Sequence, residues 1–277
     1  MPTNPPIDKD KKDTKAAPGV TPRVEVPGDA HADDRVMLEG PHSRSRETWL
    51  IYHVVKDFVQ GFRTMHFVGP CVTVFGSARV KENHPYYQLG RDVGAGLARL
   101  GFTVMTGGGP GMMEAANRGA REAGGRSVGV NITLPQEQYV NPYLDRSVTC
   151  RYFFTRKVIL FKYSYAFVAL PGGLGTLDEL TEALTLIQTK KILHYPVVLF
   201  GAAYWRGFTA LLEDMVKAGT VSAGDLKLFL VTDDLKEALA HIKKHAIEEF
   251  GLSPKPPAPS RLLGETSYPF VVTDQAP

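Results

Sequence analysis

The chain has 277 residues, of which 43% are hydrophobic and 22% charged, ordinary values for a globular protein. Its 32 basic and 29 acidic residues nearly balance, so bulk charge favours neither nucleic-acid nor membrane binding. Two cysteines are too few for a disulfide framework, and no apolar run approaches the roughly 18 residues of a membrane span, so we expect a cytoplasmic protein.

Two polar segments flank the body of the chain. Residues 1–45 are rich in Pro, Lys and Asp and poor in large apolar side chains, a composition typical of disorder. Residues 251–277 contain a second Pro-rich stretch, PKPPAPS. The segment between them, residues 46–250, has the size of one domain. We therefore predict a single folded domain between a disordered N-terminal tail and a Pro-rich C-terminal tail.

Helical and strand patterns alternate through this domain. Helices are predicted where apolar residues recur every three to four positions, and strands at short apolar runs. In chain order we predict helix 47–66, strand 71–75, helix 85–100, strand 102–105, helix 111–123, strand 127–132, helix 153–163, strand 165–170, helix 177–189, strand 196–200, helix 204–217, strand 228–231 and helix 234–249. This alternation predicts an α/β, Rossmann-like fold, a doubly wound parallel sheet with helices on both faces.

Two glycine clusters each follow a predicted strand and open a predicted helix. The first is GGGPGMMEAAN at residues 107–117, and the second is PGGLGTLDEL at residues 171–180. Such loops suit an anion, because glycine lets backbone N–H groups approach it and the helix N-terminus adds partial positive charge. The candidate phosphate-binding residues are Gly108, Gly109, Gly111, Gly172, Gly173, Gly175, Thr176 and, after the first strand, Ser77. The alternative is that these glycines only turn the chain.

The sequence lacks the common nucleotide-binding and metal-binding motifs. No Gly-Lys dipeptide exists, which excludes the G-x-x-x-x-G-K-[ST] loop. Asp178 stands where the third glycine of a dinucleotide fingerprint would fall, so no nicotinamide or flavin cofactor is expected. His241 and His245 are one helical turn apart but match no zinc motif, so no metal is expected. Two phosphate-type loops without either fingerprint indicate a mononucleotide.

Glu179 and the Arg156-Lys157 pair are the candidate reactive side chains. Thr176 and Glu179 have the spacing of a capping box, in which both would satisfy helix N–H groups. Glu179 nevertheless lies off the apolar stripe of its helix and is free to face a ligand. Arg156 offers a planar fork for phosphate or carboxylate. The alternative for the pair, Arg156 with Lys157, is a solvated start of a helix.

Together these residues resemble the Lonely Guy family, whose members are cytokinin-activating nucleoside 5′-monophosphate phosphoribohydrolases. The stretch PGGLGTLDE at residues 171–179 fits that family's P-G-G-x-G-T-x-x-E signature at every fixed position. The likeness runs from about Cys71 to Ile242. Related sequences often carry the name lysine decarboxylase, but no pyridoxal-phosphate lysine site is recognisable.

The resemblance implies hydrolysis of adenosine-type or cytokinin-type 5′-monophosphates to the free base and ribose 5-phosphate, without a cofactor. It implies that Glu179 and Arg156 are catalytic, and that Gly172, Gly173, Gly175 and Thr176 form the phosphate loop. It also implies a homo-oligomer, a dimer or larger. The chain departs from plant-type members at Glu114, where they have a small residue, and at Phe154-Thr155, where they have His-Glu. These differences are typical of a bacterial subgroup.

N-glycosidic cleavage passes through an oxocarbenium-like sugar. Glu179 is expected to stabilise that cation, bind ribose hydroxyls or activate water, and Arg156 to orient the substrate or help the leaving base. Lys157 is expected beside the phosphate, and Glu114 and Asn117 are candidates for ribose or base contacts. Two other functions remain open: a non-catalytic mononucleotide sensor and a phosphoribosyl transferase.

Overall fold

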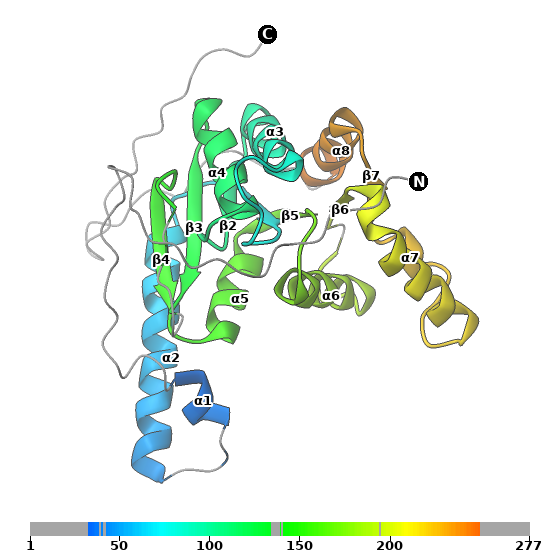
Figure 1. Ribbon diagram of the computed structural model, residues 1–277. Coiled ribbons are helices and arrows are strands. Elements are labelled where there is room, and N and C mark those ends of the chain that lie inside the picture. The colour runs from blue at the N-terminus through cyan, green and yellow to red at the C-terminus, as the bar shows by residue number, and fades with distance from the viewer. Residues whose placement is uncertain are drawn as a thin grey trace, which may run out of the picture.

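The computed structural model describes residues 33–38, 40, 43–133, 139, 141–193 and 195–249 (Figure 1). The predicted C-terminal tail lies outside the described residues, and so does most of the predicted N-terminal tail. Within the latter, Asp33–Leu38 forms a short helix, α1, which the sequence did not predict. Among the residues described, no helix combines the length and apolar character that crossing a membrane requires.

A seven-stranded sheet, in which every pairing is parallel, forms the centre of the described structure, with the order β4-β3-β2-β1-β5-β6-β7. The strands are β1 (Cys71–Phe75), β2 (Thr103–Thr106), β3 (Ser127–Ile132), β4 (Arg146–Cys150), β5 (Ser164–Ala169), β6 (Val197–Phe200) and β7 (Leu230–Thr232). The chain enters at β1, builds outward to β4 on one side and then returns to β5 on the other. The predicted Rossmann-like, doubly wound α/β fold is confirmed.

Helices cover both faces of the sheet, as Figure 1 shows. They are α2 (Arg44–Met65), α3 (Pro85–Arg99), α4 (Met112–Glu122), α5 (Phe153–Lys162), α6 (Leu174–Gln188), α7 (Ala202–Lys217) and α8 (Leu235–Ile242). The side chains of α2, α5, α6 and α7 form one buried cluster with the sheet, and those of α3, α4 and α8 form the other. Strand residues alternate between the clusters, since Phe167 joins the first and Val168 the second.

Besides α1, three elements differ from the prediction in ways that bear on the fold or the site. Strand β4 was missed because its sequence, RSVTC, lies at the sheet edge and is not a continuous apolar run. Helix α6 begins at Leu174 rather than residue 177, with Gly173 as its N-cap. The last predicted helix is α8 followed by a π-helical segment, Lys243–Glu249. Only the change in α6 affects the candidate site.

The strand order has its switch point between β1 and β5. These two neighbours are followed by connections that lead to opposite sides of the sheet, the arrangement that leaves room for a ligand at the carboxyl ends of the strands. The loops after β1, β2 and β5 all end at this edge. The two glycine clusters therefore lie at the same edge of the sheet, on either side of the loop after β1, although about 60 residues separate them in the sequence.

Candidate active site

Backbone hydrogen bonds join the three loops at the carboxyl edge of the sheet. The Ser77 N–H donates to the Pro171 carbonyl at 3.0 Å, and the Ser77 carbonyl accepts from the Met112 N–H at 2.9 Å. Gly111, the N-cap of α4, has φ +71°, and a Cβ there would collide with the Ser77 carbonyl oxygen. Glycine is therefore required at this junction for both conformation and space.

The second glycine loop is open toward solvent. Gly172 gives room to the Thr176 side chain, because a Cβ at Gly172 would overlap the threonine hydroxyl. Side chains at Gly173 or Gly175 would meet no atom within 4 Å. Helix α6 starts here, and its N-cap residue Gly173 offers no side chain that could accept a hydrogen bond from the first N–H groups of the helix. The predicted phosphate loop thus presents an uncrowded helix N-terminus.

The first glycine loop is instead closed by bonds within the protein. The Gly108 N–H donates to Thr106 Oγ1 at 2.9 Å, and the Gly108 carbonyl accepts from the Asn141 N–H at 3.1 Å. The Asn131 amide, oriented with its nitrogen toward the loop, donates to the Gly107 carbonyl at 2.6 Å. Gly108 was expected to bind phosphate, but this geometry gives its N–H to Thr106.

Glu179 lies in the second turn of α6 and is 8% exposed. Its Oε2 atom is buried and has no hydrogen-bond partner among the described residues. Burial raises the pKa of this carboxyl to about 7, although Arg156 and Lys157 pull it downward. The capping-box alternative is wrong, because the helix cap is Gly173 and no side chain caps this terminus.

Arg156, on α5, reaches the ends of β2 and β3. Its Nε donates to the Val130 carbonyl at 2.8 Å, and one Nη lies 3.5 Å from the Gly107 carbonyl oxygen. Burial lowers the pKa of the guanidinium, while the charge of Glu179 acts in the opposite direction. The structure therefore brings Arg156 and Glu179 together, and the solvated-pair alternative does not describe Arg156.

Lys157 pairs with two carboxylates of α6. Its ammonium pairs with Asp178 at 2.8 Å and Glu182 at 2.6 Å, both on α6. Burial alone would lower the pKa of Lys157, but the two carboxylates outweigh it and raise the pKa. Two carboxylates already hold the charge of Lys157, and its expected contact with phosphate stays a prediction.

A pocket of about 360 Å³ adjoins that ion pair on the outer surface of α5 and α6. It is lined by Phe153, Phe154, Lys157, Val158, Asp178 and Glu182. Neither Glu179 nor Arg156 lines it, so the pocket is a separate surface feature.

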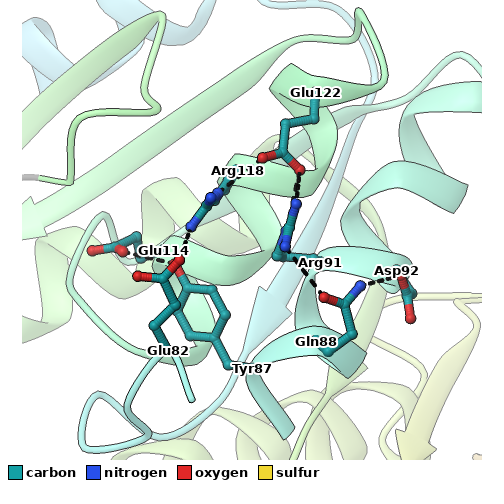
Figure 2. Close-up of polar contacts among 8 residues, drawn as sticks. All are labelled: Glu82, Tyr87, Gln88, Arg91, Asp92, Glu114, Arg118 and Glu122. Carbon is teal, nitrogen blue, oxygen red and sulfur yellow. Dashed lines mark hydrogen bonds and ion pairs between the residues drawn. The ribbon is translucent and has the colours of Figure 1, made fainter. Parts of the chain in front are cut away.

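Glu114 was a candidate for the substrate, and Figure 2 shows what it contacts. Its Oε1 accepts from the Tyr87 hydroxyl of α3 at 2.7 Å, and its Oε2 accepts from the Tyr139 hydroxyl. Arg118, one turn further along α4, pairs with Glu82 and with Glu122. Both carboxylate oxygens of Glu114 are therefore already bonded within the protein.

Asn117 is fully buried, with 0% of its surface exposed. Its Oδ1 accepts from Thr106 Oγ1 at 2.6 Å and from Asn141 Nδ2 at 3.0 Å. The expected contact with ribose or base is corrected, because the amide is enclosed and holds the first glycine loop through Thr106. The sequence did not reveal the roles of Thr106, Asn131 and Asn141, since no motif marks polar residues that brace a loop.

The chain was compared with known proteins. Residues 113–242 match a family model described as "Possible lysine decarboxylase". The chain is 34% identical over 163 residues to the cytokinin riboside 5′-monophosphate phosphoribohydrolase of Mycobacterium marinum, covering 56% of this chain and 85% of that protein. It is 30% identical over 178 residues to a probable enzyme of the same name from Oryza sativa subsp. japonica, covering 63% of this chain and 72% of the relative.

A solved structure also matches. The molybdenum cofactor carrier protein of Chlamydomonas reinhardtii is 28% identical, covers 64% of this chain and 97% of its own, and superposes with a TM-score of 0.48. The sequence relatives show the family, because the chain covers 85% of the Mycobacterium marinum protein and 72% of the Oryza sativa protein. On that likeness, the chain belongs to the Lonely Guy family of phosphoribohydrolases.

Proposed function

We propose that this protein hydrolyses the N-glycosidic bond of nucleoside 5′-monophosphates of the adenosine or cytokinin type, releasing the free base and ribose 5-phosphate. The relatives named for this reaction support the proposal, and the candidate site has the parts that the reaction needs. We place the reaction in the cytoplasm, where the two thiols, both unpaired, remain reduced.

The 5′-phosphate binds at the N-terminus of α6. There the loop from Gly172 to Thr176 offers backbone N–H groups, a hydroxyl and the positive end of the helix macrodipole. The open space in front of Gly173 and Gly175 is where phosphate oxygens approach the backbone. No metal is needed for this binding, because the helix terminus supplies the favourable charge.

Glu179 then acts on the ribose end of the same nucleotide. Its ionised carboxylate accepts a proton from water, whose oxygen forms the new bond to C1′. The electron pair of the C1′–N bond leaves with the base, which takes up a proton. The carboxylate also stabilises the cationic sugar of the transition state. Arg156, cationic and close to Glu179, orients the anionic groups of the site.

One observation carries the assignment: a buried carboxylate oxygen of Glu179 lacks any partner within the described protein. Leaving such a group unbonded costs about 1–3 kcal/mol, so a structural role alone gives no reason for it. A substrate or water that bonds to this oxygen supplies the reason. The pKa near 7 allows both protonation states at neutral pH.

The test is release of free base from a panel of nucleoside 5′-monophosphates, followed by chromatography. Wild-type protein should release base and ribose 5-phosphate in equal amounts, and Glu179→Gln should lower turnover by about 10²–10⁴-fold. Glu213→Gln, which removes an exposed carboxylate of α7, is the matched control and should keep wild-type turnover. Binding without release would contradict the proposal and favour a sensor, and release only with an added acceptor would favour a transferase.

We also propose that the protein is a homo-oligomer. Five large apolar side chains of α2 are between 48% and 62% exposed: Trp49, Ile51, Tyr52, Val55 and Val59. A contiguous apolar face of this kind is typical of a protein–protein interface.

A further inference from the structure

A buried carboxylate on the long N-terminal helix contacts the element that carries Arg156. Asp57 of α2 is 7% exposed, and α2 packs against α5. A charged side chain is rarely buried without partners that compensate the lost hydration. The hydrogen-bond partners of Asp57 therefore indicate its role.

Those partners lie in the first turn of α5 and in the two residues that lead into it. Asp57 Oδ2 accepts from the Arg151 N–H at 2.8 Å and from the Tyr152 N–H at 3.4 Å. The Thr155 hydroxyl lies 2.8 Å from the same oxygen and 2.8 Å from the Tyr152 carbonyl oxygen, so it can donate to either. Tyr152, the N-cap residue, makes no side-chain cap of its own. Asp57 thus caps the end of α5 by holding the two residues that precede it and the Thr155 hydroxyl, from a helix almost 100 residues earlier in the chain, and its negative charge suits that terminus.

The capped turn leads directly into Arg156. Thr155 is fully buried and immediately precedes it, and the Arg156 N–H donates to the Tyr152 carbonyl at 3.2 Å. From this anchored start the guanidinium extends 2.8 Å from the Val130 carbonyl oxygen. A shift in the first turn of α5 would therefore move the guanidinium relative to Glu179.

We propose that Asp57 is a positioning residue for the reaction: it fixes the first turn of α5 and thereby holds Arg156 in place beside Glu179. The inference rests on the proposed function. It assigns a role to α2, which lies outside residues 113–242 that the family model matches. It also explains why a carboxylate is buried in the contact between α2 and α5, where an apolar residue would pack without loss of hydration.

Two isosteric variants test the contact. Asp57→Asn removes the charge and keeps the shape, and Thr155→Val removes the hydroxyl and keeps the shape. Each should lower kcat by about 10- to 100-fold with a smaller change in KM, the loss expected when a catalytic group is displaced by about 1 Å. Thr155→Ser keeps the hydroxyl and should recover most of the turnover. Glu47→Gln, which neutralises an exposed carboxylate of the same helix, should leave turnover unchanged.

A double-mutant cycle separates positioning from general stability. If Asp57 acts through Arg156, then Asp57→Asn should change kcat by less than about twofold in an Arg156→Ala background. Additive losses would overturn the inference, and so would a wild-type kcat in both isosteric variants. Hydrogen exchange at the Arg151 and Tyr152 amides, faster in Asp57→Asn, checks the cap without any substrate. If wild-type protein releases no base, the proposed function fails. If it does and the variants match it, only this inference fails.

Discussion

Glu179 and Glu182 lie one turn apart on α6, yet their surroundings give them different chemistry. Glu182 is partly exposed and pairs with Lys157 at 2.6 Å. Glu179 is buried, with one oxygen unbonded within the described protein and a pKa raised to about 7. Desolvation is the dominant cause of that shift, and the nearby cations only moderate it. The carboxylate that we propose as the reactive one is therefore the one that the fold has removed from water.

This pKa predicts the pH dependence of the reaction. The ionised form of Glu179 accepts the proton from water, so kcat/KM should rise with pH and level off above a midpoint of about 7. A carboxyl with the ordinary value of 4.5 would already be fully ionised at that midpoint. Initial rates of base release across a pH series measure the curve. A midpoint near the ordinary value, or the same limb in Glu179→Gln, would contradict the assignment.

The raised pKa of Glu179 also makes the stability of the folded protein depend on pH, and stability falls over the range in which activity rises. The pKa of folded Glu179 is higher than its unfolded value, so the stability that this group contributes is fully present below about 4.5. It is lost as pH rises through about 7, because the buried carboxyl must then ionise. Thermal unfolding of wild type and Glu179→Gln at both ends of this range separates this effect from a loss of activity.

The two glycine loops have similar compositions, but they differ in how open their backbone is to a ligand. The loop after β2 is enclosed by Thr106, Asn131 and Asn141, which bond to its backbone. The loop after β5 stands at the switch point of the sheet, and among the described residues no atom lies within 4 Å of a Cβ placed at Gly173 or Gly175. We therefore expect the phosphate at the second loop.

Alanine substitution distinguishes a ligand from a turn in this second loop. Gly175→Ala adds a methyl group that meets no protein atom, so the fold should tolerate it. If phosphate oxygens approach this backbone, KM for the nucleotide should rise by about tenfold or more, since the methyl group takes their place. Steady-state kinetics and a melting curve measure the two effects.

Gly207→Ala on α7 is the matched control for this substitution. Its Cβ would also meet nothing within 4 Å, and it lies in a helix interior. It should raise stability by up to about 1 kcal/mol and leave KM unchanged. An unchanged KM in Gly175→Ala would show that the loop only turns the chain.

The whole molecule is packed unequally on its two sides. On one face, α3 and α4 approach so closely that a Cβ at Gly94 would collide with the Ala116 carbonyl oxygen and one at Gly119 with the Arg91 carbonyl oxygen. On the other face, α2 extends beyond the sheet (Figure 1). Its outward apolar side chains are exposed in the described part of the chain. Contact with a second copy would bury this surface.

Sedimentation equilibrium tests the oligomer that this asymmetry implies. The chain has a mass of 30.4 kDa, and the wild-type protein should sediment as a multiple of it. Val55→Glu places a charge in the middle of the exposed face of α2 and should shift the protein toward the monomer. Leu211→Glu, which alters a leucine that is 51% exposed on α7, is the control and should leave the mass unchanged. A wild-type monomer would contradict the proposal.

The sequence by itself determined the parts of this protein that depend on local pattern. Strands β1 and β3 begin and end where their apolar runs do, and the alternation of strands and helices was sufficient for the doubly wound fold. The two glycine clusters also predicted an anion site, which remains a prediction, because glycine and a following helix are local properties of the chain.

Only the tertiary structure decided the burial, the pKa and the hydrogen-bond partners of the polar side chains. Glu179 became a buried carboxylate rather than a helix cap because α6 starts at Leu174, and Asn117 and Glu114 were taken by partners from β2, α3 and the loop before β4. Asp57 met α5 across almost 100 residues of sequence. Periodicity reveals which face of an element is buried, but the pKa and partners of a polar group depend on whatever distant segment lies opposite it.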